Sequence, residues 1–315
     1  MVDEATGGGQ TAPCKVAYLL FELWEEGTLY ERLEQLDGRA EWLPAALSVA
    51  VLLQVAEALE SMHALSPPMA HYDVKPHNVL VAGLSDAALA ARRAAAAAAA
   101  RADGGSAAAA ARGAAHGGGA RPVRVALMDF GSARECELEL TSRKAALELS
   151  EFAEANVTAS YRAPELFDPP SRGRVDARVD VWSLGCLLFS VMNGGRSPFE
   201  DEAGATGGSL ALAAMSGKVR WKVPDEPADA PNDWSAQQPP ALKALCEELL
   251  TVDAAARPTM SVATDQLRAI LAAAEAGEPH VAAAPAGVHV ELPAMRPPAQ
   301  EAPPDEEAEI LANRE

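Results

Sequence analysis

The feature that most constrains this chain is a polar run, residues 71–78, that leads directly into a short apolar segment. The run reads His-Tyr-Asp-Val-Lys-Pro-His-Asn and brings Asp73, Lys75 and Asn78 close together in the sequence. This set suits phosphoryl transfer, in which a carboxylate orients the attacking hydroxyl, a cation neutralises the moving phosphoryl group and an amide helps to hold Mg²⁺. Such chemistry requires these groups near one γ-phosphate, and the run supplies three of them on one loop.

A second carboxylate completes the set. Asp129 begins the tripeptide Asp-Phe-Gly and follows the strand-like segment 123–128. Pairing that segment with residues 79–81 as a hairpin would bring Asn78 and Asp129 to the same end, facing one metal ion. Taken alone, Asp129 has a simpler alternative as a turn residue at the end of a strand, because Asp-Phe-Gly by itself is a weak signal.

The two halves of this hairpin are separated by residues 84–121, a low-complexity segment dominated by alanine and glycine. Alanine favours helix, but we expect no large side chain to dock the segment on a core. The prediction is a solvent-exposed insertion, helical in part or disordered. Its arginines are sparse, so an RNA-binding arm is the less favoured alternative.

Helical patterns account for much of the rest. Thr28 is a candidate cap for a short helix over 29–33, and the glutamates just before it are expected on a solvated face. A long helix with one apolar stripe should follow Pro44. Further helices are predicted at 143–154, 181–192, 241–250 and 261–274. The second of these is apolar nearly all round, which places it at the centre of the core.

Composition limits the partners. The 315 residues carry a formal net charge of -19, which argues against nucleic acid or an anionic membrane held by overall charge. The four cysteines lie far apart without a Cys-x-x-Cys spacing, so neither a zinc site nor a disulfide framework is indicated. No uninterrupted apolar stretch reaches about 18 residues, and the first residues lack the pattern of a signal peptide. Residues 1–14 are expected to be a flexible leader, and 275–315 a disordered acidic tail rich in Pro and Ala.

Further motifs follow the polar run in order. They are Asp-Phe-Gly at 129–131, Ala-Pro-Glu at 163–165, Asp-Val-Trp-Ser-Leu-Gly at 180–185 and finally Arg257. With them, residues 15–274 resemble a eukaryotic protein kinase domain, from the fifth strand of the small lobe through the whole large lobe. The resemblance implies an α+β fold with a large helical lobe, a hinge and one small-lobe strand.

A narrower resemblance is to the Numb-associated kinases, and within them to the branch of myristoylated and palmitoylated serine/threonine kinases. It is carried by the residues at 26–29, 127–133, 160–167 and 180–186. A helical insert in the activation segment, here about 143–154, also suits that branch.

The resemblance gives each catalytic candidate a role. Asp73 would orient the substrate hydroxyl and accept its proton, and Lys75, a mark of serine/threonine kinases, would contact the γ-phosphate of ATP. Asn78 and Asp129 would bind Mg²⁺. Thr158 falls where such kinases hydrogen-bond the catalytic aspartate and lysine.

The resemblance also implies an adenine site. Phe21 would be the gatekeeper, the Glu22 carbonyl and the Trp24 backbone would meet adenine at the hinge, and Leu80 would form the floor. Residues 16–21 are a candidate buried strand, and Phe21 and Leu80 should be core residues on any interpretation.

Supporting roles follow in the same way. Glu165 and Arg257 would form a buried ion pair that braces the activation segment, and Asp180 would hold the backbone of the catalytic loop. His63 and His77 look incidental, because a lone histidine is usually neither ligand nor base.

Two departures from the family pattern matter. Tyr72 stands where most of these kinases carry the arginine that pairs with a phosphorylated activation segment, which argues against activation by phosphorylation but not against the chemistry. In addition, only 14 residues precede the expected fifth strand. They leave no room for the glycine-rich phosphate loop, the lysine of the third strand or its glutamate partner.

We therefore expect a serine/threonine protein kinase that transfers the ATP γ-phosphate to protein hydroxyls, as an incomplete chain with weak or no activity as written. A non-catalytic kinase-like scaffold is the alternative. The expected partners are Mg²⁺, ATP and protein substrates with Ser or Thr, without nucleic acid, and the expected state is a monomer. The expected location is cytoplasmic, and the resemblance implies peripheral association with Golgi or vesicle membranes through an anchor that this chain does not contain.

Overall fold

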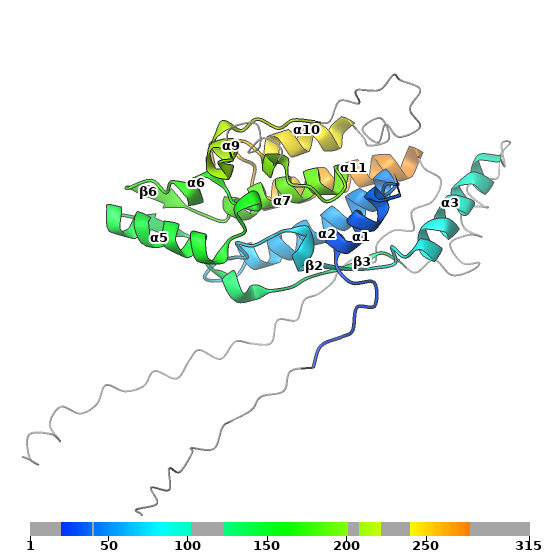
Figure 1. Ribbon diagram of the computed structural model, residues 1–315, viewed down its shortest axis with the longest axis horizontal. Coiled ribbons are helices and arrows are strands. Elements are labelled where there is room, and N and C mark those ends of the chain that lie inside the picture. Colours follow the sequence, from blue (N-terminus) through cyan, green and yellow to red (C-terminus); the bar gives the residue numbers. More distant parts are fainter. Residues whose placement is uncertain (1–19, 40, 102–121, 201–207, 222–239, 278–315) are drawn as a thin grey trace, which may run out of the picture. The chain divides into compact units, whose positions relative to one another are not determined.

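The computed structural model describes residues 20–39, 41–101, 122–200, 208–221 and 240–277. Helices predominate in these residues, and the strands form three separate two-stranded sheets (Figure 1). This is the helix-rich α+β architecture expected from the sequence. The expected leader at 1–14 and most of the expected tail lie outside the described residues.

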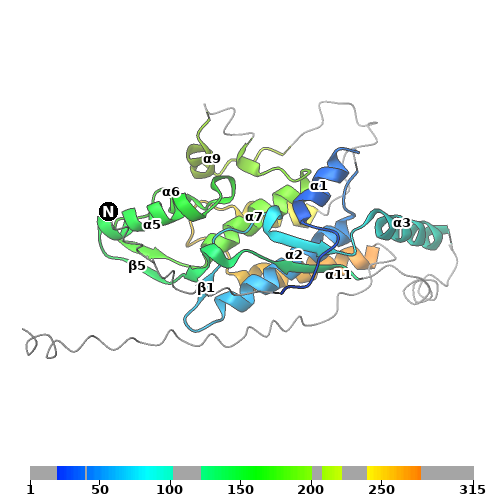
Figure 2. The same cartoon turned by 60° about the horizontal axis from the view of Figure 1, so that its bottom comes forward.

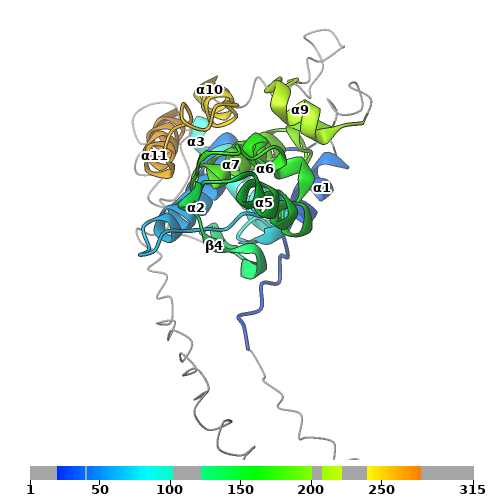
Figure 3. The same ribbon diagram turned by 90° about the vertical axis from the view of Figure 1, so that its left-hand side faces the viewer.

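Four long helices build the core. Helix α2 (Ala45–His63) packs against α11 (Met260–Gly277) and α7 (Arg178–Met192), and α7 also packs on α10 (Pro240–Leu249). In the end-on view of Figure 3, α7 lies in the middle, with α2, α10 and α11 to one side. All residues of α7 from Val179 to Met192 are buried, as its apolar pattern predicts.

Helix α2 is the one helix among the described residues that is long and apolar enough to cross a membrane. Of its most apolar window, 72% is buried inside the protein. That burial is explained by its packing between α7 and α11, which identifies α2 as a core helix.

The hairpin expected from the sequence is present. Strand β2 (Val79–Ala82) pairs antiparallel with β3 (Arg124–Leu127), with Val79 opposite Leu127. A short 3-10 turn, η1 (Pro76–Asn78), enters the hairpin, and a second, η2 (Phe130–Ser132), follows it. The two ends that carry Asn78 and Asp129 are therefore neighbours.

Two small sheets fix the segment that follows the hairpin. Strand β1 (Met69–Ala70) pairs with β4 (Arg134–Glu135), and β5 (Leu138–Leu140) pairs with β6 (Gly173–Val175). Between β5 and β6 lie the helical elements of the activation segment. These are α5 (Arg143–Asn156), η3 (Ala159–Tyr161) and α6 (Pro164–Phe167).

Helix α1 (Leu29–Asp37) is longer than the predicted 29–33, because Leu33 and Leu36 are both buried against the core. Its start is as expected. The Thr28 side chain accepts a hydrogen bond from the Glu31 amide, and the Glu31 carboxylate accepts one from the Thr28 amide, which together form a capping box. Across the core, a short helix, α9 (Leu210–Ser216), packs on η3 and α6.

The alanine-rich insertion is docked at its start, which corrects the prediction that nothing would dock it. It forms α3 (Asp86–Arg101), labelled in Figures 1 and 2 at the end away from α5. Two large side chains do the docking, since Leu84 and Leu89 are both buried in the core. Residues 102–121 lie outside the described part of the chain.

Polar contacts hold the same junction. The Glu26 carboxylate, expected on a solvated face, accepts hydrogen bonds from the amides of Gly83 (3.0 Å) and Leu84 (2.7 Å). Asp86 bridges α3 to α1, with 2.7 Å to the Arg32 guanidinium and 2.8 Å to that of Arg39. The beginning of the insertion is thus tied to the body on both its apolar and polar sides.

The prediction of burial for Phe21 is wrong. Its side chain is 84% exposed, and Leu20 and Leu23 are exposed as well. Leu20 and Phe21 form no strand, and residues 16–19 lie outside the described part. The physical reason is that no described element covers these side chains. Leu80, also expected in the core, is half-buried, although it pairs with Ala126 inside the hairpin.

Candidate active site

The polar run folds into one loop in which the predicted catalytic side chains touch. Lys75 Nζ donates to Asp73 Oδ2 at 2.7 Å and to Thr158 Oγ1 at 2.6 Å. The Thr158 amide donates to Asp73 Oδ1 at 3.0 Å, so the start of η3 closes onto the loop. Asn78 Nδ2 donates to both the backbone oxygen and Oδ2 of Asp73 at 2.8 and 3.0 Å. All four predicted catalytic residues therefore belong to one network.

This network keeps Asp73 ionised. Burial of the Asp73 carboxylate opposes its ionisation, but hydrogen bonds from Lys75 and Thr158 outweigh that effect and lower the pKa of Asp73. An ionised carboxylate accepts hydrogen bonds and carries no proton of its own. At neutral pH, Asp73 can therefore orient a substrate hydroxyl and accept its proton.

Asn78 and Asp129 are brought together by the hairpin. The Met128 amide donates to the Asn78 backbone oxygen at 2.9 Å, which places Asp129 one residue beyond that bond. Asp129 adopts a left-handed conformation, with φ of 63°, and its side chain is exposed. Strained conformations of this kind in non-glycine residues cluster at functional sites.

The two side chains fit a magnesium ion. Asn78 uses its amide nitrogen on Asp73, and among the described residues no donor contacts its side-chain oxygen. Mg²⁺ prefers oxygen ligands and is held by one or two protein groups together with water and phosphate oxygens. No group of three or more Asp, Glu, His or Cys side chains that could hold a metal ion occurs among the described residues. A magnesium site completed by water and phosphate oxygens does not require such a group. Asn78 and Asp129 are the residues that would hold the ion.

The catalytic loop is held from below by Asp180, as predicted. Its carboxylate is fully buried and accepts hydrogen bonds from the amides of His71 (2.8 Å) and Tyr72 (2.9 Å). A third contact was missed by sequence reasoning: His63 Nε2 lies 2.9 Å from Asp180 Oδ2. His63 is therefore part of the support of the loop. No local signal could reveal this, because the partners are 117 residues apart.

The imidazole of His71 supports the loop rather than serving as a base. Its ring nitrogens contact the backbone oxygen of Met128 at 3.1 Å and the backbone amide of Asp73 at 3.3 Å. The Ser132 hydroxyl donates to the His71 backbone oxygen at 2.7 Å. His71 thus links the catalytic loop to the segment that carries Asp129.

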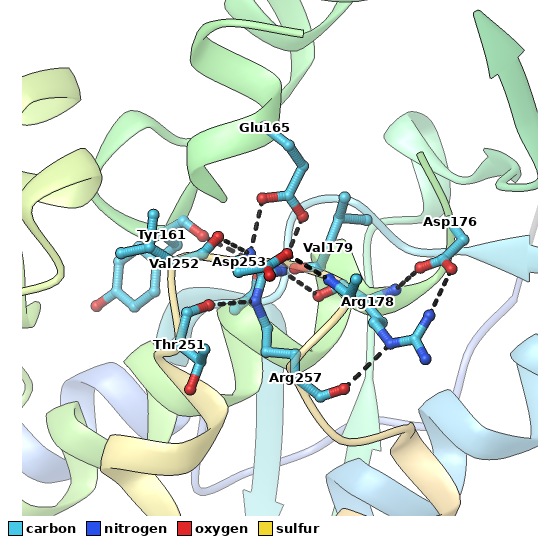
Figure 4. Close-up of polar contacts among 11 residues, drawn as sticks. Tyr161, Glu165, Asp176, Arg178, Val179, Thr251, Val252, Asp253 and Arg257 are labelled. Atoms are coloured by element: carbon cyan, nitrogen blue, oxygen red, sulfur yellow. Dashed lines mark hydrogen bonds and ion pairs between the residues drawn. The ribbon is translucent and has the colours of Figure 1, made fainter. Parts of the chain in front are cut away.

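A second support lies under the activation segment, as predicted. Arg257 NH1 and NH2 donate to the two carboxylate oxygens of Glu165 at 2.7 and 2.8 Å. Figure 4 shows the Arg257 side chain enclosed by this carboxylate and by backbone oxygens, among them those of Thr251 and Val252. The guanidinium is fully buried, and each of these acceptors helps to offset the cost of removing its charge from water.

Tyr72 replaces charge pairing with apolar packing. Its side chain is buried, and its ring meets Phe152 of α5 edge-on at a centroid distance of 5.4 Å. The Arg134 guanidinium lies over the ring of Phe152, 4.5 Å from its centroid. The helix of the activation segment is therefore attached to the catalytic loop by aromatic contacts.

The predicted adenine residues are only partly assembled. Glu22 pairs with Arg124 of β3 at 3.0 Å, and the same guanidinium lies 4.9 Å from the Trp24 ring centroid. Leu80, the predicted floor of the site, lies in the neighbouring strand β2. Phe21 extends from this group into solvent.

Known proteins match this chain over most of its length. The family model of the protein kinase domain matches residues 11–267. Serine/threonine-protein kinase 16 of Mus musculus is 31% identical over 254 residues, which is 81% of this chain and 66% of that protein. The Homo sapiens protein of the same name is 30% identical over 254 residues, again 81% and 66%.

A probable serine/threonine-protein kinase of Dictyostelium discoideum is 42% identical over 228 residues, 63% of this chain and 61% of that protein. The chain thus spans slightly less than two thirds of the length of these relatives. The match includes the catalytic loop, the hairpin and both buried supports. On this evidence the chain belongs to the protein kinase family, and the relatives that it resembles are named as serine/threonine kinases.

Proposed function

We propose that this protein transfers the γ-phosphate of ATP to serine or threonine hydroxyls of other proteins. The observation that carries the proposal is the network of Asp73, Lys75, Asn78 and Thr158 at the end of a hairpin that also delivers Asp129. Phosphoryl transfer relies on positioning and charge stabilisation, and this network provides both from one loop.

Each of these residues has a separate role in the proposed reaction. Asp73 orients the substrate hydroxyl and accepts its proton, while Thr158 and Lys75 hold the Asp73 carboxylate in place. The Lys75 ammonium also stabilises negative charge that develops on the phosphoryl oxygens. Asn78 and Asp129 hold Mg²⁺, which, when bound, neutralises the charge of the nucleotide phosphates.

Magnesium-dependent nucleotide binding tests this assignment without requiring turnover. Titration of the chain with ADP, with and without Mg²⁺, should show tighter binding in the presence of the ion. Asp129→Asn should reduce that magnesium-dependent gain, because the ion then loses a charged ligand. Glu151→Gln, which changes an exposed carboxylate of α5, is the matched control and should behave as wild type. Nucleotide binding of Asp129→Asn that keeps the full magnesium effect would refute the assignment.

Residues 1–315 by themselves should transfer phosphate slowly. Among the described residues, no element covers the predicted adenine site, where Phe21 is 84% exposed. A cover over adenine is worth about 2–3 kcal/mol for about 100 Å² of buried apolar surface. A rate of peptide phosphorylation typical of kinases, measured on this chain alone, would contradict the expectation.

A non-catalytic scaffold is the second candidate, and exposed apolar side chains favour it. Phe21 is 84% exposed and Phe130 is 50% exposed, and apolar surface of this kind suits a partner protein. The nucleotide titration separates the two, because a scaffold would not require the magnesium effect.

Within the family, the motifs at 127–133 and 160–167 and the helix α5 support placement among the Numb-associated kinases. By the same resemblance, a cytoplasmic location with peripheral association at Golgi or vesicle membranes is part of the proposal.

A further inference from the structure

A cavity of about 740 Å³ lies beside the catalytic loop. Lys75, Asn78 and Thr158 of the proposed active site line it. The cavity is therefore positioned to receive the residues of a protein substrate that flank the phosphorylated hydroxyl. The rest of its lining can select among substrates.

The rest of this lining is acidic. Glu34 and Asp37 come from α1, and Glu200 comes from the segment after α7. Arg196 contributes one positive charge, and the charge of Lys75 is matched by Asp73 at 2.7 Å. Among the described residues that line the cavity, three carboxylates thus stand against one guanidinium for which no carboxylate partner is seen there.

A pair of aromatic side chains lines the cavity beside the carboxylates. His77 stacks on Tyr30 with ring centroids 3.8 Å apart. Glu34 and Glu200 line the same cavity as this stacked pair, so α1 and the segment after α7 bring negative charge to one place.

Helix α1, which carries Glu34 and Asp37, is held in position. Arg32 lies on α1 between the stacked Tyr30 and Glu34, is itself buried, and is bonded to Asp86 at 2.7 Å and to Gln35 at 3.1 Å. Asp37 lies against Gly194, where an added Cβ would come within 2.6 Å of the Asp37 carboxylate. The helix that carries two of the three carboxylates is therefore fixed, which lowers the ordering cost of binding a cation there.

We propose that this cavity binds an arginine or lysine side chain of the protein substrate, close in sequence to the serine or threonine that is phosphorylated. The inference rests on the proposed function, since it takes the cavity to be part of the substrate site. Glu34, Asp37 and Glu200 are its specificity-determining residues.

Direct peptide binding tests the inference without phosphate transfer. The probes are serine peptides of one sequence in which a single arginine, moved from position to position along the peptide, is compared with glutamine. At low salt the wild-type chain should bind one of the arginine peptides about fivefold more tightly than its glutamine counterpart, and added salt should weaken that preference.

The variants are Glu34→Gln, Asp37→Asn and Glu200→Gln, each of which removes a charge and keeps the shape of an exposed side chain. Each should reduce the arginine preference, and the triple variant should abolish it. Glu151→Gln, on α5 and outside the cavity, should keep it. Equal binding of all arginine and glutamine peptides to wild type, or a preference that survives in the triple variant, would overturn the inference.

The same peptides distinguish this inference from the proposed function. An arginine preference in binding without any phosphate transfer by the native protein would contradict the proposed function and support the cavity assignment. Transfer to serine peptides without any arginine preference in binding would contradict the cavity assignment alone.

Discussion

The two sides of the catalytic loop are built differently. On the side that faces helix α7, here called the lower side, Asp180 and Arg257 are fully buried. Their charges are satisfied by partners within the same lobe. On the other side, which carries the proposed nucleotide site and is here called the upper side, Asp129 and Phe130 are exposed, and Phe21 extends into solvent. The lower side is therefore complete in itself, whereas the upper side presents ligands and apolar surface to other groups.

This difference explains how a loop can be positioned before its substrates arrive. Each buried carboxylate or guanidinium below the loop fixes backbone atoms at definite places, and leaving such a charge without its partner costs far more than losing an exposed pair. For the proposed function the upper side needs accessible oxygens for Mg²⁺ and phosphate, and its acidic residue Asp129 is exposed. Substitutions on the two sides should therefore have unequal effects on stability.

The largest effect is expected from Glu165→Ala. The substitution leaves the fully buried Arg257 guanidinium without a carboxylate, which should lower the free energy of unfolding by about 3 kcal/mol or more. Urea denaturation measures it. The control is Glu57→Ala, which removes the exposed pair with Arg268 and should cost less than about 1 kcal/mol. Similar losses for both variants would remove the distinction between buried and exposed charges on which the comparison of the two sides rests.

A smaller effect is expected from His63→Ala. Asp180 would keep its two backbone donors but lose the His63 contact, at a cost of about 1–2 kcal/mol. Hydrogen exchange of the His71 and Tyr72 amides should become faster, because the carboxylate that accepts them is less firmly held. Unchanged exchange at both amides would show that His63 does not support the loop.

The contribution of Asp73 to stability should depend on pH. Its pKa in the folded protein lies below the value of about 3.9 typical of an unfolded chain. The stabilisation is therefore present above about pH 4 and is lost as the pH falls through the folded pKa. Unfolding free energies of wild type and Asp73→Asn, measured from pH 7 to pH 3, should converge toward the acid end. A constant difference over this range would contradict the assigned network.

The smallest effect is expected from Phe21→Ser. Because this side chain is 84% exposed, the free energy of unfolding of residues 1–315 should change by less than about 0.5 kcal/mol. The same urea measurement applies. A loss of several kcal/mol would mean that Phe21 is buried in solution, and the upper side would then be closed as well.

Features with a local pattern were predictable from the sequence. Thr28 as a helix cap, the buried helix α7 and the hairpin of β2 and β3 follow from capping chemistry, apolar periodicity and strand length. The grouping of Asp73, Lys75 and Asn78 was predictable because the sequence places them within one short run. The structure confirms the cap, the buried helix, the hairpin and this grouping, whereas the catalytic roles of the three residues stay a prediction.

Features that depend on partners far away in the sequence were not predictable from the sequence. The role of His63 depends on Asp180, far away in the sequence. The docking of the insertion depends on two leucines, Leu84 and Leu89, that are inconspicuous in an alanine-rich segment. Phe21 was wrongly predicted to be buried, because an apolar residue is buried only when another element covers it.

The most direct test of the account is phosphate transfer by the native protein, isolated from its source cells and compared with Asp73→Asn prepared in the same way. Asn keeps the size of the side chain but cannot accept the substrate proton, so the rate with Mg²⁺ and ATP should fall about 100-fold or more. An Asp73→Asn protein that phosphorylates serine peptides at the wild-type rate would contradict the claim that the Asp73 loop is a catalytic centre.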